Sequence, residues 1–445
     1  MHTTMRIGRT LPPAAAPIGI REMVSGFRGI VRGQEELDRF RAELKDLFGV
    51  RHCFLVSSGK VAFTLILLAL KDLFPGRDTV LIPAFTCYSV PSSIVRAALK
   101  IRLCDLHPNT LDFDFAQLSA LLSKPSPTLG ADTSCYPAIK VSQCETSSTF
   151  DTRNSATRLL AVVPTHLFGI PADVPRLRRL AHDPDVTVVE DAAQAMGEAW
   201  DGRKLGTLGD VSFFSLGRGK AFSTVEGGVI LTDRDDIAEK LERHVADLLC
   251  YSLGELLNLV LKAVVLTLFL RPLLFWIPRS MPFLKMGETL FEPHFPMRKM
   301  SSFQAGLTRN WRARLQKFLE RRKKNVDRWI VVLRTQGFHG LGFQNCPELG
   351  LIRFPIRLTK LETRRFLLKE SEKKGLGIMP VYPNTIAGIQ GLKGFVGAQA
   401  FPVAETCARG LVTLPTHNYL TQRDITEISR LLSNALTHEL CTSSA

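Results

Sequence analysis

The chain has little that could build a disulfide-rich fold or a cysteine-bound zinc site. Its nine cysteines are odd in number and irregularly spaced, and no two of them form a CxxC pair. A disulfide framework is therefore not expected, and no metal site is predicted. Such cysteine usage is typical of a protein in the reducing cytoplasm.

The start of the chain lacks the apolar core that a secretory signal peptide requires, although residues 1–19 include basic side chains. The sequence also lacks zinc-finger, basic-zipper and RNA-binding signatures, so nucleic acid is not an expected partner. The net charge is +15, from 57 basic and 42 acidic residues. That balance favours anionic partners, such as phosphorylated metabolites or acidic lipid surfaces.

The composition changes along the chain and predicts several units. Pro and Gly are frequent at the start, where an irregular arm is expected, and two later stretches stand out as insertions. The predicted units are an N-terminal arm (1–33), a large domain (34–252) with a polar surface insertion (124–157), an apolar insertion (253–297) and a small C-terminal domain (298–445).

Short apolar runs alternate with amphipathic helical patterns through the large domain, which predicts an α/β fold with a mainly parallel sheet covered by helices. Helices are predicted over 34–48, 60–73 and 90–99, and strands over 52–56, 79–82, 101–105, 159–164, 186–190, 211–214 and 228–231. The C-terminal part predicts a smaller α+β domain. Functional groups are expected where parallel strands end.

Residues 162–230 hold the motifs that carry chemistry. They contain VVEDAAQA, a GxxxGxxGDxSFFS run, Lys220 five positions after Ser215, and then Glu-Gly-Gly. In this order the motifs resemble the DegT/DnrJ/EryC1/StrS family of sugar aminotransferases, which use pyridoxal phosphate. The resemblance extends from about residue 34 to 436, apart from the two insertions. It implies a fold-type I aminotransferase that acts as a homodimer.

The same resemblance implies the reaction. An amino group would pass from an amino acid, expected to be glutamate, to a keto-sugar that is nucleotide- or lipid-linked. The expected setting is the synthesis of cell-surface glycans or secondary metabolites.

Asp191 and Gln194 are predicted to hold the ring of the cofactor. Pyridoxal phosphate withdraws electrons best when its ring nitrogen is protonated, and a carboxylate beside that nitrogen stabilises the cation. Asp191 lies at the end of a predicted strand, where such a group is expected. By resemblance, Gln194 contacts the phenolic oxygen of the ring. The alternatives are a helix cap for Asp191 and a surface amide for Gln194.

Lys220 is the predicted catalytic residue, because a lysine amine can bond to the cofactor aldehyde and then move a proton. It lies between an apolar strand and a Gly-Gly strand start, which is an unusual place for a solvated charge. Neighbouring Arg218 cannot take this role. Some relatives carry His at this position and act as dehydratases, so Lys220 favours amino transfer. Dehydration on the same scaffold remains an alternative.

Ser58, Gly59 and Ser215 are predicted to bind the cofactor phosphate. A Ser-Gly pair at a helix start presents backbone N–H groups along the helix dipole, and glycine lets the backbone approach closely. The hydroxyl of Ser215 would add a donor. Simple helix capping is the alternative for the Ser-Gly pair.

Three residues depart from the family pattern. Lys60 follows Gly59 where Thr is usual, and a lysine could still bind phosphate as a point charge. Cys87 replaces the aromatic residue that stacks on the cofactor, and Tyr88 is the predicted substitute. Met297 stands where the family often has an Asn that reaches the cofactor phosphate of the partner subunit. These changes leave open a second hypothesis, a non-catalytic regulatory or membrane-bound scaffold.

Three further residues lie near the expected pocket. His166 and Thr165 follow a predicted strand, and His166 is a candidate base, with a packed structural histidine as the alternative. In the C-terminal part, GLGIMPVYP resembles a signature of the family's small domain. Tyr382 in that stretch is predicted to approach substrate.

The apolar stretch 253–285 is too broken by Asn, Lys, Arg and Pro to be a clear membrane span, and a helical hairpin is expected instead. Three locations remain open: a dimer contact, a cover over the pocket, or a patch that dips into one leaflet. A basic segment, 298–328, follows it and would suit acidic headgroups. Peripheral contact with the inner face of the membrane through both segments is therefore a hypothesis.

Overall fold

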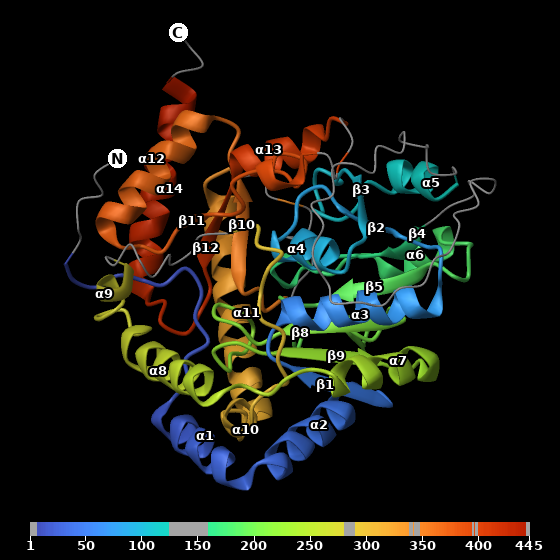
Figure 1. Cartoon of the computed structure of the whole chain (residues 1–445). Helices are drawn as coiled ribbons and strands as arrows, with labels where there is room; N and C mark the ends of the chain where they lie inside the picture. Colours follow the sequence, from blue (N-terminus) through green and yellow to red (C-terminus); the bar gives the residue numbers. More distant parts are fainter. Residues whose placement is uncertain are drawn as a thin grey trace.

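The computed structural model describes residues 7–123, 159–279, 290–337, 341, 348–393, 396 and 399–441. Its centre is a seven-stranded sheet with the order β1-β9-β8-β5-β4-β2-β3 (Figure 1). The strands are β1 (His52–Val56), β2 (Thr79–Pro83), β3 (Lys100–Cys104), β4 (Leu159–Val162), β5 (Thr187–Asp191), β8 (Val211–Ser215) and β9 (Gly228–Thr232).

The sheet is mainly parallel, as predicted. Strands β3, β2, β4, β5 and β8 pair in parallel, whereas β9 runs antiparallel to both of its neighbours, β8 and β1. Neighbouring residues Val188 and Val189 of β5 belong to different apolar clusters, because alternate side chains of a strand point to opposite faces. Both faces of the sheet are therefore covered.

Helices pack on both faces. Helix α3 (Gly59–Leu73) contacts β1, β8 and β9 and also its neighbours α4 (Ser89–Arg96) and α7 (Asp235–Ala246). It is apolar nearly all round, as expected for a helix buried between a sheet and other helices. Helices α5 (Phe115–Ser123) and α6 (Val174–Leu180) contact each other and contribute to the second apolar cluster. Shorter elements are η2 (Leu167–Gly169), β6 (Ala199–Trp200) and β7 (Arg203–Lys204).

The C-terminal part forms a smaller unit around an antiparallel sheet with the order β10-β12-β11. Helix α12 packs against α14 beside it (Figure 1). The elements are α10 (Ser302–Gly306), α11 (Trp311–Thr335), β10 (Arg353–Arg357), α12 (Leu361–Lys374), β11 (Met379–Pro380), η5 (Gln390–Leu392), α13 (Pro402–Gly410), β12 (Leu411–Pro415) and α14 (Gln422–Cys441).

The expected irregular arm contains a helix, α1 (Ile20–Arg32), which the prediction missed. Glycines disfavour an isolated helix, but Gly26 and Gly29 here let α1 pack closely on α10. A Cβ at Gly29 would collide with the carbonyl oxygen of Ser302, and one at Gly306 would collide with that of Ser25. Close packing against a distant segment therefore stabilises α1.

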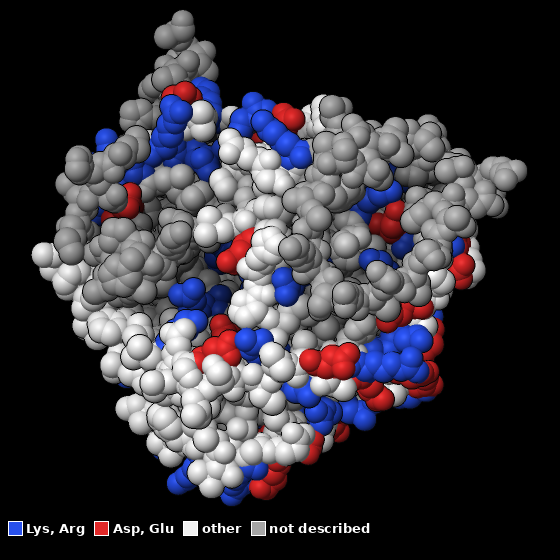
Figure 2. All heavy atoms as spheres, viewed as in Figure 1, with Lys and Arg blue, Asp and Glu red and all other residues white. Residues whose placement is uncertain are grey.

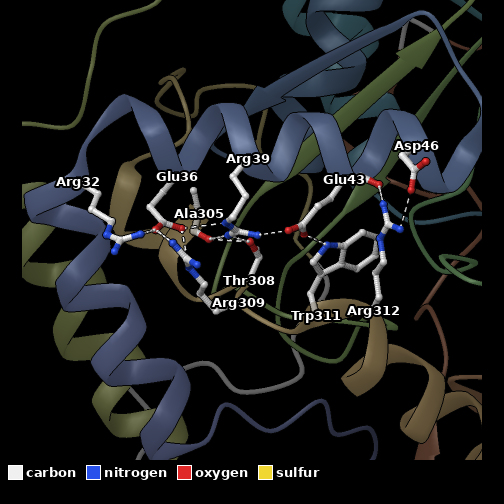
Figure 3. Close-up of polar contacts among 10 residues, drawn as sticks. All are labelled: Arg32, Glu36, Arg39, Glu43, Asp46, Ala305, Thr308, Arg309, Trp311 and Arg312. Atoms are coloured by element: carbon white, nitrogen blue, oxygen red, sulfur yellow. Dashed lines mark hydrogen bonds and ion pairs between the residues drawn. The ribbon is translucent and has the colours of Figure 1, made fainter.

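A row of charged residues joins α2 (Gln34–Phe48) to α10 and α11 (Figure 3). The carboxylate of Glu36 is 1 % exposed and accepts hydrogen bonds from Arg39 and Arg309, with the Arg39 Nε at 3.0 Å. Further along α2, Glu43 accepts a 2.7 Å hydrogen bond from the indole N–H of Trp311. These contacts fix the helix that leads into β1.

The two predicted insertions have different outcomes. The polar insertion 124–157 lies outside the described residues, as does the stretch 280–289 of the apolar one. The apolar insertion begins with α8 (Leu253–Phe269), and α9 (Trp276–Arg279) follows after a turn. None of the described helices is both long and apolar enough to cross a membrane.

The basic segment 298–328 differs from the expected open basic surface. Arg322 is only 2 % exposed, and Arg298 forms an ion pair with Glu255. Several of its arginines are held by groups from other elements: Arg298, Arg309, Arg312, Arg314 and Arg322. These five arginines are held within the protein, whereas Lys317 and Lys324 of the same segment are exposed.

Candidate active site

Asp191 and Lys220 come together at the edge of the sheet where β5 and β8 end. Asp191 is the last residue of β5 and is 4 % exposed, and its Oδ1 accepts a 3.1 Å hydrogen bond from the Ala193 N–H. Burial raises the pKa of this carboxyl, while the charge of Lys220 acts on it in the opposite direction. The two groups therefore lie within electrostatic reach of each other.

Lys220 lies in the loop between β8 and β9. Gly219, just before it, has φ of 71°, a conformation that favours glycine. The Lys220 side chain is partly buried, and the neighbouring Arg218 is exposed. The backbone of the loop is therefore shaped to direct Lys220, rather than Arg218, toward the sheet edge.

Ser58, Gly59 and Ser215 form a tight cradle at the same edge. Ser58 caps α3, and its hydroxyl accepts a 3.2 Å hydrogen bond from the Val61 N–H. A Cβ added at Gly59 would lie only 2.9 Å from the Cβ of Ser215. A Cβ at Gly228, which pairs with Ser215 in the sheet, would strike the carbonyl oxygen of Ser58. These glycines thus let the start of α3 lie close to the end of β8 and the start of β9.

Gln194 reaches across to the smaller domain. Its amide nitrogen donates to the hydroxyl of Tyr382 at 3.3 Å, and its amide oxygen accepts from the Phe168 N–H at 3.2 Å. Tyr382 is 5 % exposed, and burial raises its pKa well above the usual value. Asp191, Cys87 and Gln194 all act on this phenol. The site is therefore closed on one side by a residue of the C-terminal part.

Tyr88 is close to the site but already has partners. Its hydroxyl accepts a 2.9 Å hydrogen bond from the Asn384 N–H and donates one of 3.1 Å to the Asn384 carbonyl. Its ring stacks on that of Tyr382, with centroids 6.2 Å apart. Tyr88 thus links the large domain to the segment that carries Tyr382.

The sequence profile of the DegT/DnrJ/EryC1/StrS aminotransferase family matches residues 22–250 and 295–433, which is most of the chain. The chain belongs to this family. The match omits 251–294, the region of α8 and α9. A solved aminotransferase of pseudoaminic acid biosynthesis, PseC from Helicobacter pylori, has a TM-score of 0.71 at 13% identity, covering 96% of this chain and 99% of that one. The fold is that of fold-type I aminotransferases.

Two curated relatives are similar in sequence over part of their length. A GDP-perosamine synthase from Caulobacter vibrioides is 30% identical over 45% of this chain and 45% of its own length. An L-glutamine:2-deoxy-scyllo-inosose aminotransferase from Streptoalloteichus tenebrarius is 30% identical over 52% of this chain and 46% of its own. The chain thus spans about half the length of the curated relatives it matches.

Lys60 and Met297 depart from the family pattern, and both have partners in this structure. The Lys60 ammonium lies 3.1 Å from a carboxylate oxygen of Glu292 and 4.6 Å from the centroid of the Phe295 ring. The sulfur of Met297 lies 3.1 Å from Nε of Arg96. A phosphate contact by Lys60 would therefore compete with Glu292.

His166 is a structural residue. It is fully buried, its Nδ1 accepts from the Ala172 N–H at 3.0 Å, and its Nε2 lies 2.9 Å from Glu190. Since Nδ1 accepts, Nε2 carries the proton and donates it to the Glu190 carboxylate. Glu190 also accepts from three backbone N–H groups, those of Gly206, Leu208 and Gly209. Both ring nitrogens of His166, the candidate base in the sequence, therefore have partners within the protein.

Arg353 was not foreseen from the sequence. It begins β10 in the C-terminal part, and its guanidinium carbon lies 5.3 Å from the centroid of the Phe168 ring. Burial lowers its pKa, and the neighbouring Tyr382 and Cys87 oppose that shift. No carboxylate partner for it is found among the described residues. A local sequence signal was absent, because the residues it meets are far away in the chain.

Two buried hydroxyls beside the site also lack partners within the described ranges, those of Thr86 and Thr165. Thr165 pairs with Asp191 through a β-bridge. A buried hydroxyl without a hydrogen bond is costly, so each of these hydroxyls is available to a polar group that binds beside it. Together with the glycine cradle, this arrangement fits a phosphorylated ring cofactor such as pyridoxal phosphate.

Proposed function

We propose that the protein is a pyridoxal-phosphate-dependent aminotransferase that moves an amino group from an amino acid to a keto-sugar. The main support is that the buried carboxylate of Asp191, at the end of β5, lies within electrostatic reach of the ammonium of Lys220. Membership of the family supports the same assignment.

The residues that would hold the cofactor come from three elements. Ser58 and Gly59 at the start of α3, with the hydroxyl of Ser215, would hold the phosphate, because N–H groups at a helix start bind anions. Asp191 would hold the ring nitrogen and Gln194 the phenolic oxygen. When bound, the cofactor withdraws electrons from the substrate carbon that loses or gains the proton.

The chain itself would supply a negative charge, on Asp191, and a group that transfers a proton, Lys220. Asp191 is buried, so its interaction with a protonated ring nitrogen would be weakly screened by water. Lys220 would hold the aldehyde carbon through Nζ and, once released, would carry the proton between substrate and cofactor. Lys220 also favours amino transfer over dehydration, for which some relatives have His at this position.

We further propose glutamate as the donor and a nucleotide- or lipid-linked keto-sugar as the acceptor. The two curated relatives are named for a GDP-sugar product and for an L-glutamine donor, which supports this class without fixing either substrate. A screen of keto-sugar nucleotides in the presence of glutamate, with glutamate consumption as the measured quantity, would identify the donor and the acceptor. A product that lacks nitrogen would identify a dehydratase instead.

The cofactor assignment is tested by light absorption. Protein mixed with pyridoxal phosphate is expected to absorb in the near-violet, and borohydride is expected to fix the cofactor on Lys220, as located by peptide mass spectrometry. Lys220→Ala should remove the fixation and keep the fold, whereas Lys324→Ala, an exposed lysine of α11, should not. A protein that takes up no cofactor would contradict the proposal and favour the scaffold hypothesis.

A further inference from the structure

Exposed apolar side chains concentrate on one part of this protein. In the described part of the chain, all but four of the exposed large apolar residues belong to α1 or to residues 249–274. They are Ile20, Val24, Phe27, Ile30, Val31, Leu249, Leu253, Leu257, Leu261, Val264, Leu268, Leu273 and Leu274. A large apolar patch of this kind marks an interaction surface.

On α8 the exposed residues form a stripe. Leu253, Leu257, Leu261, Val264 and Leu268 are spaced by four, four, three and four positions, which places them on one side of a helix. Leu253 is 88% exposed and Leu257 70%. Asn258 and Lys262 of this helix are also exposed, but they lie beside the stripe, which is itself wholly aliphatic.

A second stripe lies on α1, where Ile20, Val24, Phe27 and Val31 are spaced by four, three and four positions. Val31 is 88% exposed. The opposite side of α1, with Gly26 and Gly29, is buried against α10. Helix α1 therefore has apolar residues on its exposed side as well as on its buried side. The packing of α1 on α10 does not require the exposed apolar residues.

The two stripes belong to one surface. The inner sides of the helices share an apolar cluster, in which Met23 of α1 and Leu259 and Ala263 of α8 pack with Phe303 of α10. Figure 1 places α1 and α8 next to each other, and the same region of Figure 2 is covered mainly by uncharged residues. Both helices lie flat on the body of the protein with their stripes outward.

Charge distinguishes between the occupants that could cover this surface. Arg21 and Arg28 follow Ile20 and Phe27 directly, so both lie along one border of the α1 stripe. Both are exposed, and neither has an acidic partner within the ranges that the structure describes. In a symmetric dimer the same surface meets itself and would bring one basic border near the other. An anionic lipid surface would instead attract it.

We propose that α1 and α8 hold this protein on an anionic lipid bilayer, lying in the plane of the membrane with both stripes among the headgroups and upper acyl chains. Amphipathic helices with an apolar side and basic borders bind membranes in this way. The family profile does not match residues 251–294, the stretch that contains α8. The surface differs from the one expected from sequence, because α1 takes the place of segment 298–328, in which five arginines have partners elsewhere in the protein.

Co-sedimentation of the full chain with vesicles tests the proposal, whether or not the protein is an enzyme. Binding to vesicles of phosphatidylglycerol and phosphatidylcholine is expected, with much weaker binding to phosphatidylcholine alone and a decrease at high salt. The pairs Leu257→Ser/Leu261→Ser and Phe27→Ser/Val31→Ser should each lower the partition coefficient at least about tenfold, since each removes buried apolar area. Arg21→Gln/Arg28→Gln should lower only the binding that depends on phosphatidylglycerol.

The matched control is Val331→Ser/Leu361→Ser, which changes two exposed apolar residues on α11 and α12. It should bind vesicles like the wild type. Because Leu257 and Leu261 are 70% and 59% exposed, the α8 pair variant should keep the thermal unfolding of the wild type. Absence of vesicle binding by the wild type would overturn the proposal. So would a stripe variant that loses self-association in sedimentation equilibrium while its vesicle binding is unchanged.

Discussion

Arg322 Nη1 donates a 2.9 Å hydrogen bond to the carbonyl oxygen of Ala221, and its Nη2 lies 3.4 Å from the carbonyl oxygen of Lys220. The arginine comes from α11 and is 2 % exposed, and burial lowers its pKa to about 10, so it stays charged at neutral pH. Its planar guanidinium thus holds two successive backbone carbonyl groups, those of Lys220 and Ala221.

Arg322→Met is predicted to disturb the position of Lys220. The backbone carbonyl groups of Ala15, Lys220 and Ala221 lose a charged donor, and each such loss costs about 1–3 kcal/mol where the carbonyl stays buried. We expect kcat to fall at least about tenfold with little change in KM, because the proton carrier and not the substrate contacts is displaced. Steady-state kinetics with cofactor-saturated protein would measure this effect.

Arg322→Lys should restore part of kcat relative to Arg322→Met, because a lysine can still donate to one of these carbonyls. The control is Lys324→Met, an exposed residue of the same helix, which should leave kcat unchanged. Equal losses in kcat for the Met and Lys variants, matched by equal losses in stability, would indicate a purely structural role.

Arg353 is predicted to bind the carboxylate of the amino donor. It is a guanidinium without an acidic partner among the described residues, and it acts on Tyr382, which in turn hydrogen-bonds Gln194. Arg353→Met should raise the KM for the donor by about tenfold or more, since a charged hydrogen bond contributes about 1.5–3 kcal/mol. Arg357→Met at the other end of β10 is the control. A KM that stays unchanged would refute this role.

Glu36 is predicted to stabilise the joint between α2 and α11 (Figure 3). Burial raises the pKa of this carboxyl, but hydrogen bonds from Arg309 and Arg39 outweigh that effect and lower it. Glu36→Ala should lower the free energy of unfolding by about 1–3 kcal/mol, because its arginine partners are themselves partly exposed. Urea unfolding would measure the loss. Glu35→Ala, whose side chain is 71% exposed, should change it little.

The pH dependence of the Glu36 contribution has a definite sign. A carboxyl whose pKa is lowered on folding stabilises the fold above its unfolded pKa. The difference between wild type and Glu36→Ala should therefore be largest near neutral pH and shrink as the pH falls through the lowered pKa. A difference that grows on acidification would contradict this assignment.

Glu198 should show the opposite dependence. Burial raises its pKa to about 7, although its carboxylate accepts a 3.0 Å hydrogen bond from the Gly350 N–H. Between the ordinary value of 4.5 and about 7 the folded state binds the proton more tightly than the unfolded chain. The stability contribution is therefore present at low pH and is lost as the pH rises through that window, by up to about 3 kcal/mol.

Glu198→Gln removes this ionisation while keeping an oxygen that can accept from Gly350. The variant should unfold at higher urea concentration than the wild type at pH 8 and at a similar concentration at pH 4. Equal urea midpoints for the two proteins at pH 8 would show that Glu198 is not protonated more easily in the folded state.

Local pattern was enough to predict much of the large domain. Strand β1 and helix α2 have the predicted bounds, since apolar runs and helical spacing are local properties. Asp191 and Lys220 were predicted from motifs that resemble those of the family, and their roles stay predictions. In the structure the charge of Lys220 acts on the carboxyl of Asp191.

Features that depend on distant contacts were missed. Helix α1 contains glycines that argue against a helix until α10 packs on them. Arg322 belongs to a run of four basic residues that reads as a solvated surface, yet it is buried because backbone carbonyls of another segment take its hydrogen bonds. Arg353 faces Phe168 only after the C-terminal part has folded back.

Strand β9 pairs with β1 on one side and β8 on the other, and its first residue, Gly228, lies opposite both Val56 and Ser215. The two parts of the cradle, Ser58 and Gly59 after β1 and Ser215 at the end of β8, therefore both depend on pairing with β9. Separation of β9 from its neighbours would displace both parts at once, so release of a bound cofactor and unfolding of this sheet edge would be one cooperative event. Cofactor binding would accordingly slow amide hydrogen exchange along the whole of β9.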